Sequence, residues 1–85
     1  MEYKIYEVTK KWFKETIMSK FVENIVEGIE NFDINAVAHI YVFFDYVNLH
    51  EYALTVQVIY VDGRYDDDMF SITEDERDKY MDLMQ

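Results

Sequence analysis

The sequence contains no cysteine and no proline, and its only glycines are Gly28 and Gly63. Without cysteine the chain forms neither disulfides nor thiolate metal sites, so packing alone must hold its core together. Two isolated glycines do not make the glycine-rich loop that cradles phosphates, which argues against nucleotide binding of that kind. Because the 85 residues contain no repeat and no proline-rich linker, we expect one domain over residues 1–85.

Basic residues are absent from the middle of the chain, where no lysine or arginine occurs between Phe21 and Gly63. The chain carries 18 acidic and 8 basic residues, for a formal net charge of −10. Residues 1–20 hold five lysines and three glutamates, a net charge of +2, so the other 65 residues carry −12. Such a field repels nucleic acids and anionic membranes and attracts cationic surfaces, so any partner should be basic.

Long apolar runs are also absent, and charges interrupt the hydrophobic residues at the N-terminus. We therefore expect a soluble, cytoplasmic protein with no signal peptide. Half of the residues (51%) are nevertheless hydrophobic and 18% are aromatic, which is too many for a disordered acidic tail. The negative charge is predicted to lie on a folded body.

A helical period runs through residues 9–31, where apolar residues recur every four positions at Phe13, Ile17, Phe21, Ile25 and Ile29. Trp12 and Phe13 point away from the apolar face of this helix. The helix therefore starts later, bends, or brings both aromatic side chains against another surface. Gly28 either lies within the helix or ends it.

Residues 36–47 and 52–61 are rich in β-branched and aromatic residues, and we predict an antiparallel hairpin from them. Residues 3–8 form either a short strand or a helical turn. The Asp62-Gly63 pair predicts a two-residue type I′ turn and a third strand over residues 64–70. That turn places Tyr60 opposite Tyr65, and it directs Asp66 and Asp68 to the face of Ile59.

The first strand of this hairpin is apolar on both faces, which indicates either a second covering layer or a subunit interface. A homodimer would cover the second face and also the two aromatic residues that miss the helical stripe. The predicted dimer interface consists of Trp12, Phe13, Val37, Tyr41 and Phe43.

Thr73 and Glu76 have the spacing of a capping box, which predicts a C-terminal helix over residues 74–84. The whole order is (β)αβββα. We expect an α+β, two-layer fold, in which an antiparallel meander of three to four strands packs on a long N-terminal helix and a short C-terminal helix.

No catalytic or metal-binding pattern is present. A nucleophile and base could come only from Ser19 or Ser71 with His39 or His50, and their spacing supports no such pair. The acidic runs at residues 66–68 and 74–76 lack the spacing and central glycine of a calcium-binding EF-hand loop. We therefore expect a non-enzymatic protein with no cofactor and no metal.

The acidic residues themselves are the strongest functional signal. Helical rise separates Glu23, Glu27 and Glu30 by about 6 Å and 4.5 Å along the axis, which is comparable with the roughly 3.4 Å rise per phosphate of a nucleic-acid strand. Rows of carboxylates can thus imitate rows of phosphates. The candidate partner-binding residues are Glu23, Glu27, Glu30, Asp62, Asp66, Asp67, Asp68, Glu74, Asp75, Glu76, Asp78 and Asp82.

In size, charge and expected architecture the chain resembles the phage-encoded acidic DNA-mimic inhibitors. The resemblance implies inhibition of a basic DNA-binding protein or nuclease in the host cytoplasm, without direct contact to nucleic acid. It rests on composition and identifies no individual residue. Two alternatives are an immunity or antitoxin protein that neutralises one basic toxin, and a structural interaction domain whose acids have no specific role.

Overall fold

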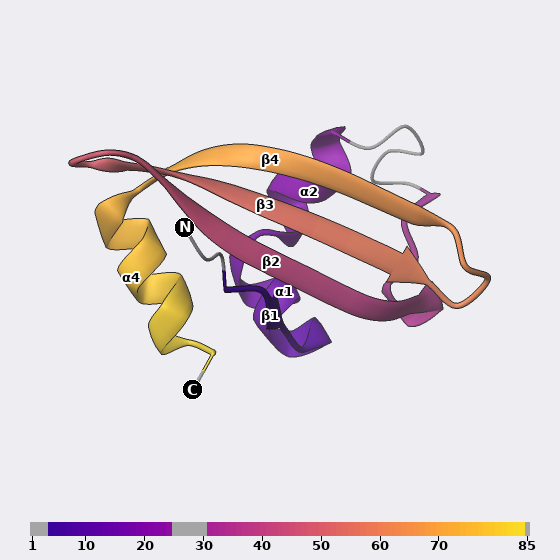
Figure 1. Cartoon of the computed structure of the whole chain (residues 1–85). Coiled ribbons are helices and arrows are strands. Elements are labelled where there is room, and N and C mark those ends of the chain that lie inside the picture. Colours follow the sequence, from indigo (N-terminus) through magenta and orange to yellow (C-terminus); the bar gives the residue numbers. More distant parts are fainter. Residues whose placement is uncertain (1–3, 25–30, 85) are drawn as a thin grey trace.

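The computed structural model describes residues 4–24 and 31–84. Its elements are, in chain order, β1 (Tyr6–Glu7), α1 (Lys10–Thr16), α2 (Met18–Asn24), the 3₁₀ turn η1 (Ile34–Ala36), β2 (Val37–Asn48), β3 (Glu51–Tyr60), β4 (Tyr65–Thr73) and α4 (Glu74–Asp82). The four strands form one antiparallel sheet in the order β1-β2-β3-β4, with helices packed on it (Figure 1). The predicted α+β fold is confirmed, and residues 3–8 include a two-residue edge strand.

The inner face of the sheet is the core face, and the long β2–β3 hairpin supplies most of it. Val42 pairs with Val56 and Ile40 with Val58, and all four side chains are almost completely buried. The buried residues of this core are Trp12, Phe13, Ile17, Phe21, Val22, Val37, Ile40, Val42, Leu54, Val56, Val58, Phe70, Ile72 and Tyr80. Because every buried strand residue belongs to the inner face, the described helices cover that face alone.

Val37 belongs to the core, although strand alternation assigns it to the opposite face from Ile40. The register between β2 and β3 shifts at this point, since Val37 pairs with Tyr60 and His39 with Ile59. Ala38 is therefore the extra residue of a β-bulge, which reverses the alternation before it. As a result Val37 is only 2% exposed, whereas Ala38 faces solvent.

The register between β3 and β4 differs from the prediction by one residue. Tyr65 pairs with Ile59, and Asp66 pairs with Val58. The cause is a three-residue loop, in which the Tyr60 amide donates to the Arg64 carbonyl and the Gly63 amide donates to the Tyr60 carbonyl. Gly63 takes the left-handed position of this loop with φ +90°, as is common in three-residue hairpins.

The described part of residues 9–31 is helical, and of the alternatives left open by the sequence the structure shows the bend, which lies at Ile17 and divides the expected long helix into α1 and α2. Thr9 caps the N-terminus of α1 by accepting a hydrogen bond from the Trp12 amide. The bend turns Trp12 and Phe13 into the same core that Phe21 enters from α2. It resolves the mismatch on the helical wheel, since each short helix has its own apolar face.

The C-terminal helix α4 starts at the predicted capping box, in which Thr73 and Glu76 exchange backbone-to-side-chain hydrogen bonds. Trp12 fixes α4 against α1, because its indole Nε1 donates to the Tyr80 carbonyl at 2.8 Å and the two rings meet edge to face. Among the described residues no helix has the length and apolar character needed to cross a membrane.

Candidate partner-binding surface

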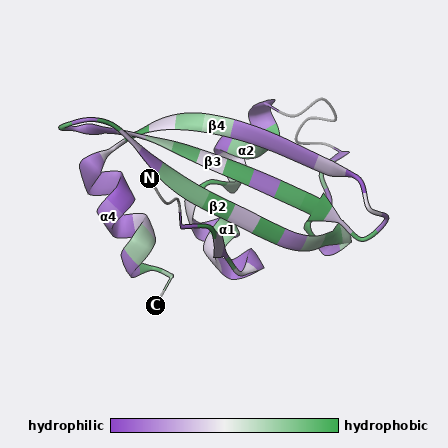
Figure 2. Cartoon of the chain, viewed as in Figure 1, coloured by the Kyte–Doolittle hydropathy of each residue, from purple (hydrophilic) through white to green (hydrophobic). Residues whose placement is uncertain are grey.

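The predicted acidic residues fall into three groups in the fold. Glu23 is exposed near the end of α2, whereas Glu27 and Glu30 lie outside the described residues. A second group surrounds the β3–β4 turn, and a third lies on α4. Figure 2 shows the hydrophilic half of β4 near the turn and the largely hydrophilic α4.

At the β3–β4 turn, Asp62 is exposed and accepts two hydrogen bonds from Arg64. The Arg64 amide donates to Oδ1 at 3.0 Å and its Nε donates to Oδ2 at 2.7 Å. The backbone bond, with the guanidinium bond second, lowers the pKa of Asp62 below its ordinary value. Asp62 therefore stays ionised, but Arg64 neutralises part of its charge.

The three consecutive aspartates of β4 are divided between the two faces of the sheet, and the one-residue register shift decides the division. Asp66 and Asp68 lie on the inner face and are half-buried, so the prediction that they share the face of Ile59 is wrong. The Tyr60 hydroxyl donates to Asp66 Oδ2 at 2.7 Å. Asp68 Oδ2 is buried and has no hydrogen-bond partner in the described structure.

Asp67 lies on the outer face and is exposed. No hydrogen bond or ion pair to it is found within residues 4–24 and 31–84. It is consequently the aspartate of the run whose carboxylate is open to a partner.

The acidic residues of α4 differ in their hydrogen bonds, ion pairs and exposure. Glu76 accepts from the Thr73 amide at 3.0 Å and lies 3.6 Å from Lys20 Nζ. Its pKa is lowered, chiefly by the Thr73 hydrogen bond and less by Lys20. Asp78 pairs with Arg77 at 3.1 Å. Asp75 and Asp82 are exposed, and Glu74 is half-buried.

The turn and the start of α4 lie at opposite ends of β4 (Figure 1). The long axis of the molecule measures 37 Å, about one turn of B-DNA at roughly 34–36 Å. No lysine or arginine occurs in any of the four strands. Exposed lysines instead occur on α1, which follows the opposite edge strand β1. Asp67 therefore lies on the β4 edge of the sheet, opposite β1 and the lysines of α1, and Asp62 lies in the turn that precedes β4. In contrast, α4 packs against α1 through Trp12, and its Glu76 pairs with Lys20.

The proposed dimer interface needs correction. Trp12, Phe13 and Val37 are at most 3% exposed inside a single chain. They pack in the core for the reasons given above, the helix bend and the β-bulge, and are not available to a second subunit. Tyr41 and Phe43 do lie on the outer face and are partly exposed.

Sequence reasoning assigned Tyr41 and Phe43 of the outer face to a dimer interface, but it missed the acidic and polar residues that lie beside them. One cross-strand row joins Glu7, Tyr41, Gln57 and Asp67. The neighbouring rows contain Ile59 with Tyr65, and Thr55 with Met69. Alternation along each strand could have found these residues, but only with the correct β3–β4 register.

The described structure assembles no catalytic group around the histidines. His39 Nδ1 lies 3.1 Å from Glu7 Oε2, and its ring stacks on Tyr41. A surface pocket of about 370 Å³ lies beside this pair and contains no serine. The Ser71 hydroxyl donates to Glu51 at 2.6 Å. Within the described residues, no three potential ligands among His, Cys, Asp and Glu gather around a metal position.

Comparison with known proteins adds no constraint. The sequence matches no protein-family model, and no curated protein or solved structure is significantly similar to it.

Proposed function

We propose that the chain is a non-enzymatic DNA mimic that inhibits a basic DNA-binding protein or nuclease by occupying its DNA-contacting surface. The observation that carries the proposal is the distribution of charge along β4 and at its two ends. Carboxylates follow β4 from Asp62 to Asp75, while the four strands contain no lysine or arginine.

The physical basis is electrostatic. A DNA-binding protein gains affinity by neutralising phosphates and releasing their counterions. An ordered row of carboxylates offers the same partner a similar field. The exposed carboxylates of Asp62, Asp67 and Asp75 lie along β4 and at its two ends, and the 37 Å length of the molecule matches about one turn of duplex. Occupation of the basic surface then excludes DNA.

This proposal needs no cofactor and no bound metal. It assigns the protein to the cytoplasm, where its partner contacts DNA, and to the host cytoplasm for a phage-encoded chain. The partner is a protein in this proposal, because the charge of −10 opposes direct contact with nucleic acid.

The test is capture from bacterial lysate on the immobilised protein, with elution by a salt gradient. One variant carries Asp62→Asn and Asp67→Asn at the β3–β4 end. A matched control carries Lys10→Gln and Lys14→Gln on α1. We expect a DNA-binding protein to be retained, and to elute at lower salt from the aspartate variant but not from the lysine variant.

Equal elution from all three proteins would contradict a contact through the β4 side. A second elution uses excess duplex DNA as competitor. Capture of a toxin that the duplex does not displace would favour the immunity-protein alternative.

A further inference from the structure

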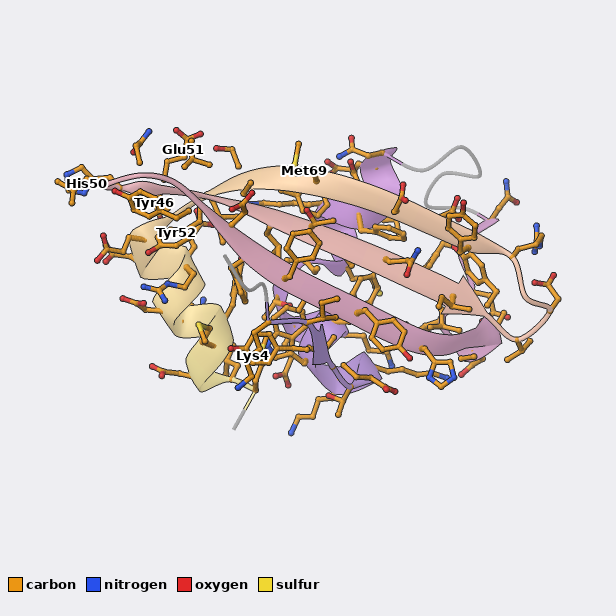
Figure 3. All side chains as sticks on the ribbon, viewed as in Figure 1. Lys4, Tyr46, His50, Glu51, Tyr52 and Met69 are labelled. Carbon is orange, nitrogen blue, oxygen red and sulfur yellow. The ribbon has the colours of Figure 1, made fainter. Side chains whose placement is uncertain are left out.

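The outer face of the sheet is a broad surface that none of the described helices covers. Tyr65 is 61% exposed and Met69 is 65% exposed, both on β4. Met69 projects from β4 away from the helices (Figure 3). Exposed aromatic and thioether side chains on one face of a sheet are typical of protein interfaces.

The outer face is also one-sided in charge. The row through its centre has a carboxylate at each end, Glu7 on β1 and Asp67 on β4, with Tyr41 and Gln57 between them. Four strands at about 4.8 Å spacing separate the two acids by roughly 14 Å. The described strands contain no lysine or arginine, and His39 of β2 is the basic side chain that they contribute to this face.

The two carboxylates at the ends of this row differ in the contacts that they already make. Glu7 already lies 3.1 Å from His39. Asp67 instead stands between Tyr65 and Met69, its neighbours on the same face at about 6.8 Å along the strand. The open carboxylate thus has an aromatic ring on one side and a soft apolar side chain on the other.

We propose that this outer face, centred on Asp67 and Tyr65, docks a protein surface that presents arginine side chains. Guanidinium pairs with a carboxylate through two parallel hydrogen bonds and stacks on an aromatic ring, whereas a lysine ammonium is a more strongly hydrated point charge. The inference rests on the proposed function, and it adds the contact surface and the kind of base that this surface selects.

Charge decides against a second copy of the chain as the occupant. Two outer faces in contact would bring Asp67 and Glu7 of each protomer into one interface, and each chain carries −10. Like charges brought together in an interface are costly. An arginine-bearing partner neutralises the same groups.

The test compares labelled octa-arginine and octa-lysine peptides by fluorescence anisotropy at about 150 mM salt. We expect wild type to bind octa-arginine roughly 3- to 10-fold more tightly than octa-lysine. Tyr65→Leu should remove this preference and leave octa-lysine binding within about twofold. Asp67→Asn should weaken binding of both peptides.

Tyr46→Leu and Glu15→Gln are matched controls, since Tyr46 is also 61% exposed and Glu15 is exposed on α1, outside the proposed binding residues. Both should leave the two affinities unchanged, and the near-ultraviolet signal of buried Trp12 reports that each variant is folded. The proposal is overturned by equal peptide affinities in wild type, by no effect of Tyr65→Leu, or by an equal effect of Tyr46→Leu.

Sedimentation equilibrium gives the remaining outcome. A dimer that Tyr65→Leu dissociates would assign the face to a second copy and would contradict the proposal. Equal affinity for both peptides, together with partner capture that depends on the β4 side, would remove the arginine site and leave the proposed function standing. If wild type prefers octa-arginine but the captured partner keeps its DNA, the arginine site would stand and the proposed function would be contradicted.

Discussion

Neighbouring residues of one acidic run have different roles, because strand alternation and register decide which side each one faces. Asp66 accepts a hydrogen bond from Tyr60 on the inner face, and Asp68 is half-buried beside it. Asp67 alone of the three points outward. A count of acidic residues therefore overestimates the charge available to a partner, and Asp67 is the residue on which the binding argument depends most.

Gly63 sets this register, and its substitution tests the explanation. Gly63 has φ +90°, and an added Cβ would meet no atom within 4 Å, so backbone conformation alone determines the cost. We expect Gly63→Ala to lower the free energy of unfolding by about 1–2 kcal/mol. Gly63→Asn should cost less, because asparagine tolerates the left-handed region.

Urea denaturation of the two variants measures both values. Equal stability of wild type and Gly63→Ala would mean that the loop does not require a left-handed residue at this position.

At the scale of elements, the capping box gives α4 a dependence on pH. The folded protein holds the pKa of Glu76 below its ordinary value of 4.5, chiefly through the Thr73 hydrogen bond. As pH falls, the unfolded chain therefore takes up the proton first, and stability decreases. The contribution of the Glu76 charge is present in full above about pH 5 and is lost as pH falls through the folded pKa.

Glu76→Gln isolates this contribution, since glutamine can keep the hydrogen bond but not the charge. We expect wild type to be more stable than Glu76→Gln near pH 7, and the difference to vanish near pH 3. Urea denaturation at the two pH values measures it. A difference that persists unchanged at the lower pH would exclude the Glu76 carboxylate as its source.

The types of the elements were predictable from the sequence. The bend at Ile17, the bulge at Ala38 and the register of β4 could not be fixed from it. The periods of β2, β3 and α4 are strong and local, and the Thr73 capping box fixes the start of its helix. The bend at Ile17 and the bulge at Ala38 arise because the core needs residues that regular periodicity would expose. Tertiary packing therefore overrode the local pattern.

The third point, the register of β4, decided the candidate site. Both a two-residue and a three-residue loop are compatible with Asp62-Gly63, and they differ by one residue in the pairing. A one-residue slip reverses every side chain of the strand. For this reason the sequence identified the acidic residues but exchanged the inward and outward ones.

At the scale of the whole molecule, the charge distribution and the length both support the proposed function. Exposed lysines lie on α1, Lys20 of α2 pairs with Glu76 of α4, and exposed carboxylates lie at both ends of β4 in a body 37 Å long. Such a charge distribution orients the protein as it approaches a basic partner and accelerates association at low salt. In the proposed complex, the uncovered outer face supplies the short-range contacts that charge alone does not.

The most direct test of DNA mimicry is a displacement assay with the protein captured from lysate, bound in advance to a labelled duplex. Increasing amounts of the acidic protein are added, and free and bound duplex are separated by electrophoresis. We predict that the duplex is released as an equimolar complex of the two proteins forms, and that release requires more of the Asp62→Asn/Asp67→Asn variant. A ternary complex that retains the duplex would show that the acidic protein binds elsewhere on its partner, and would contradict the account.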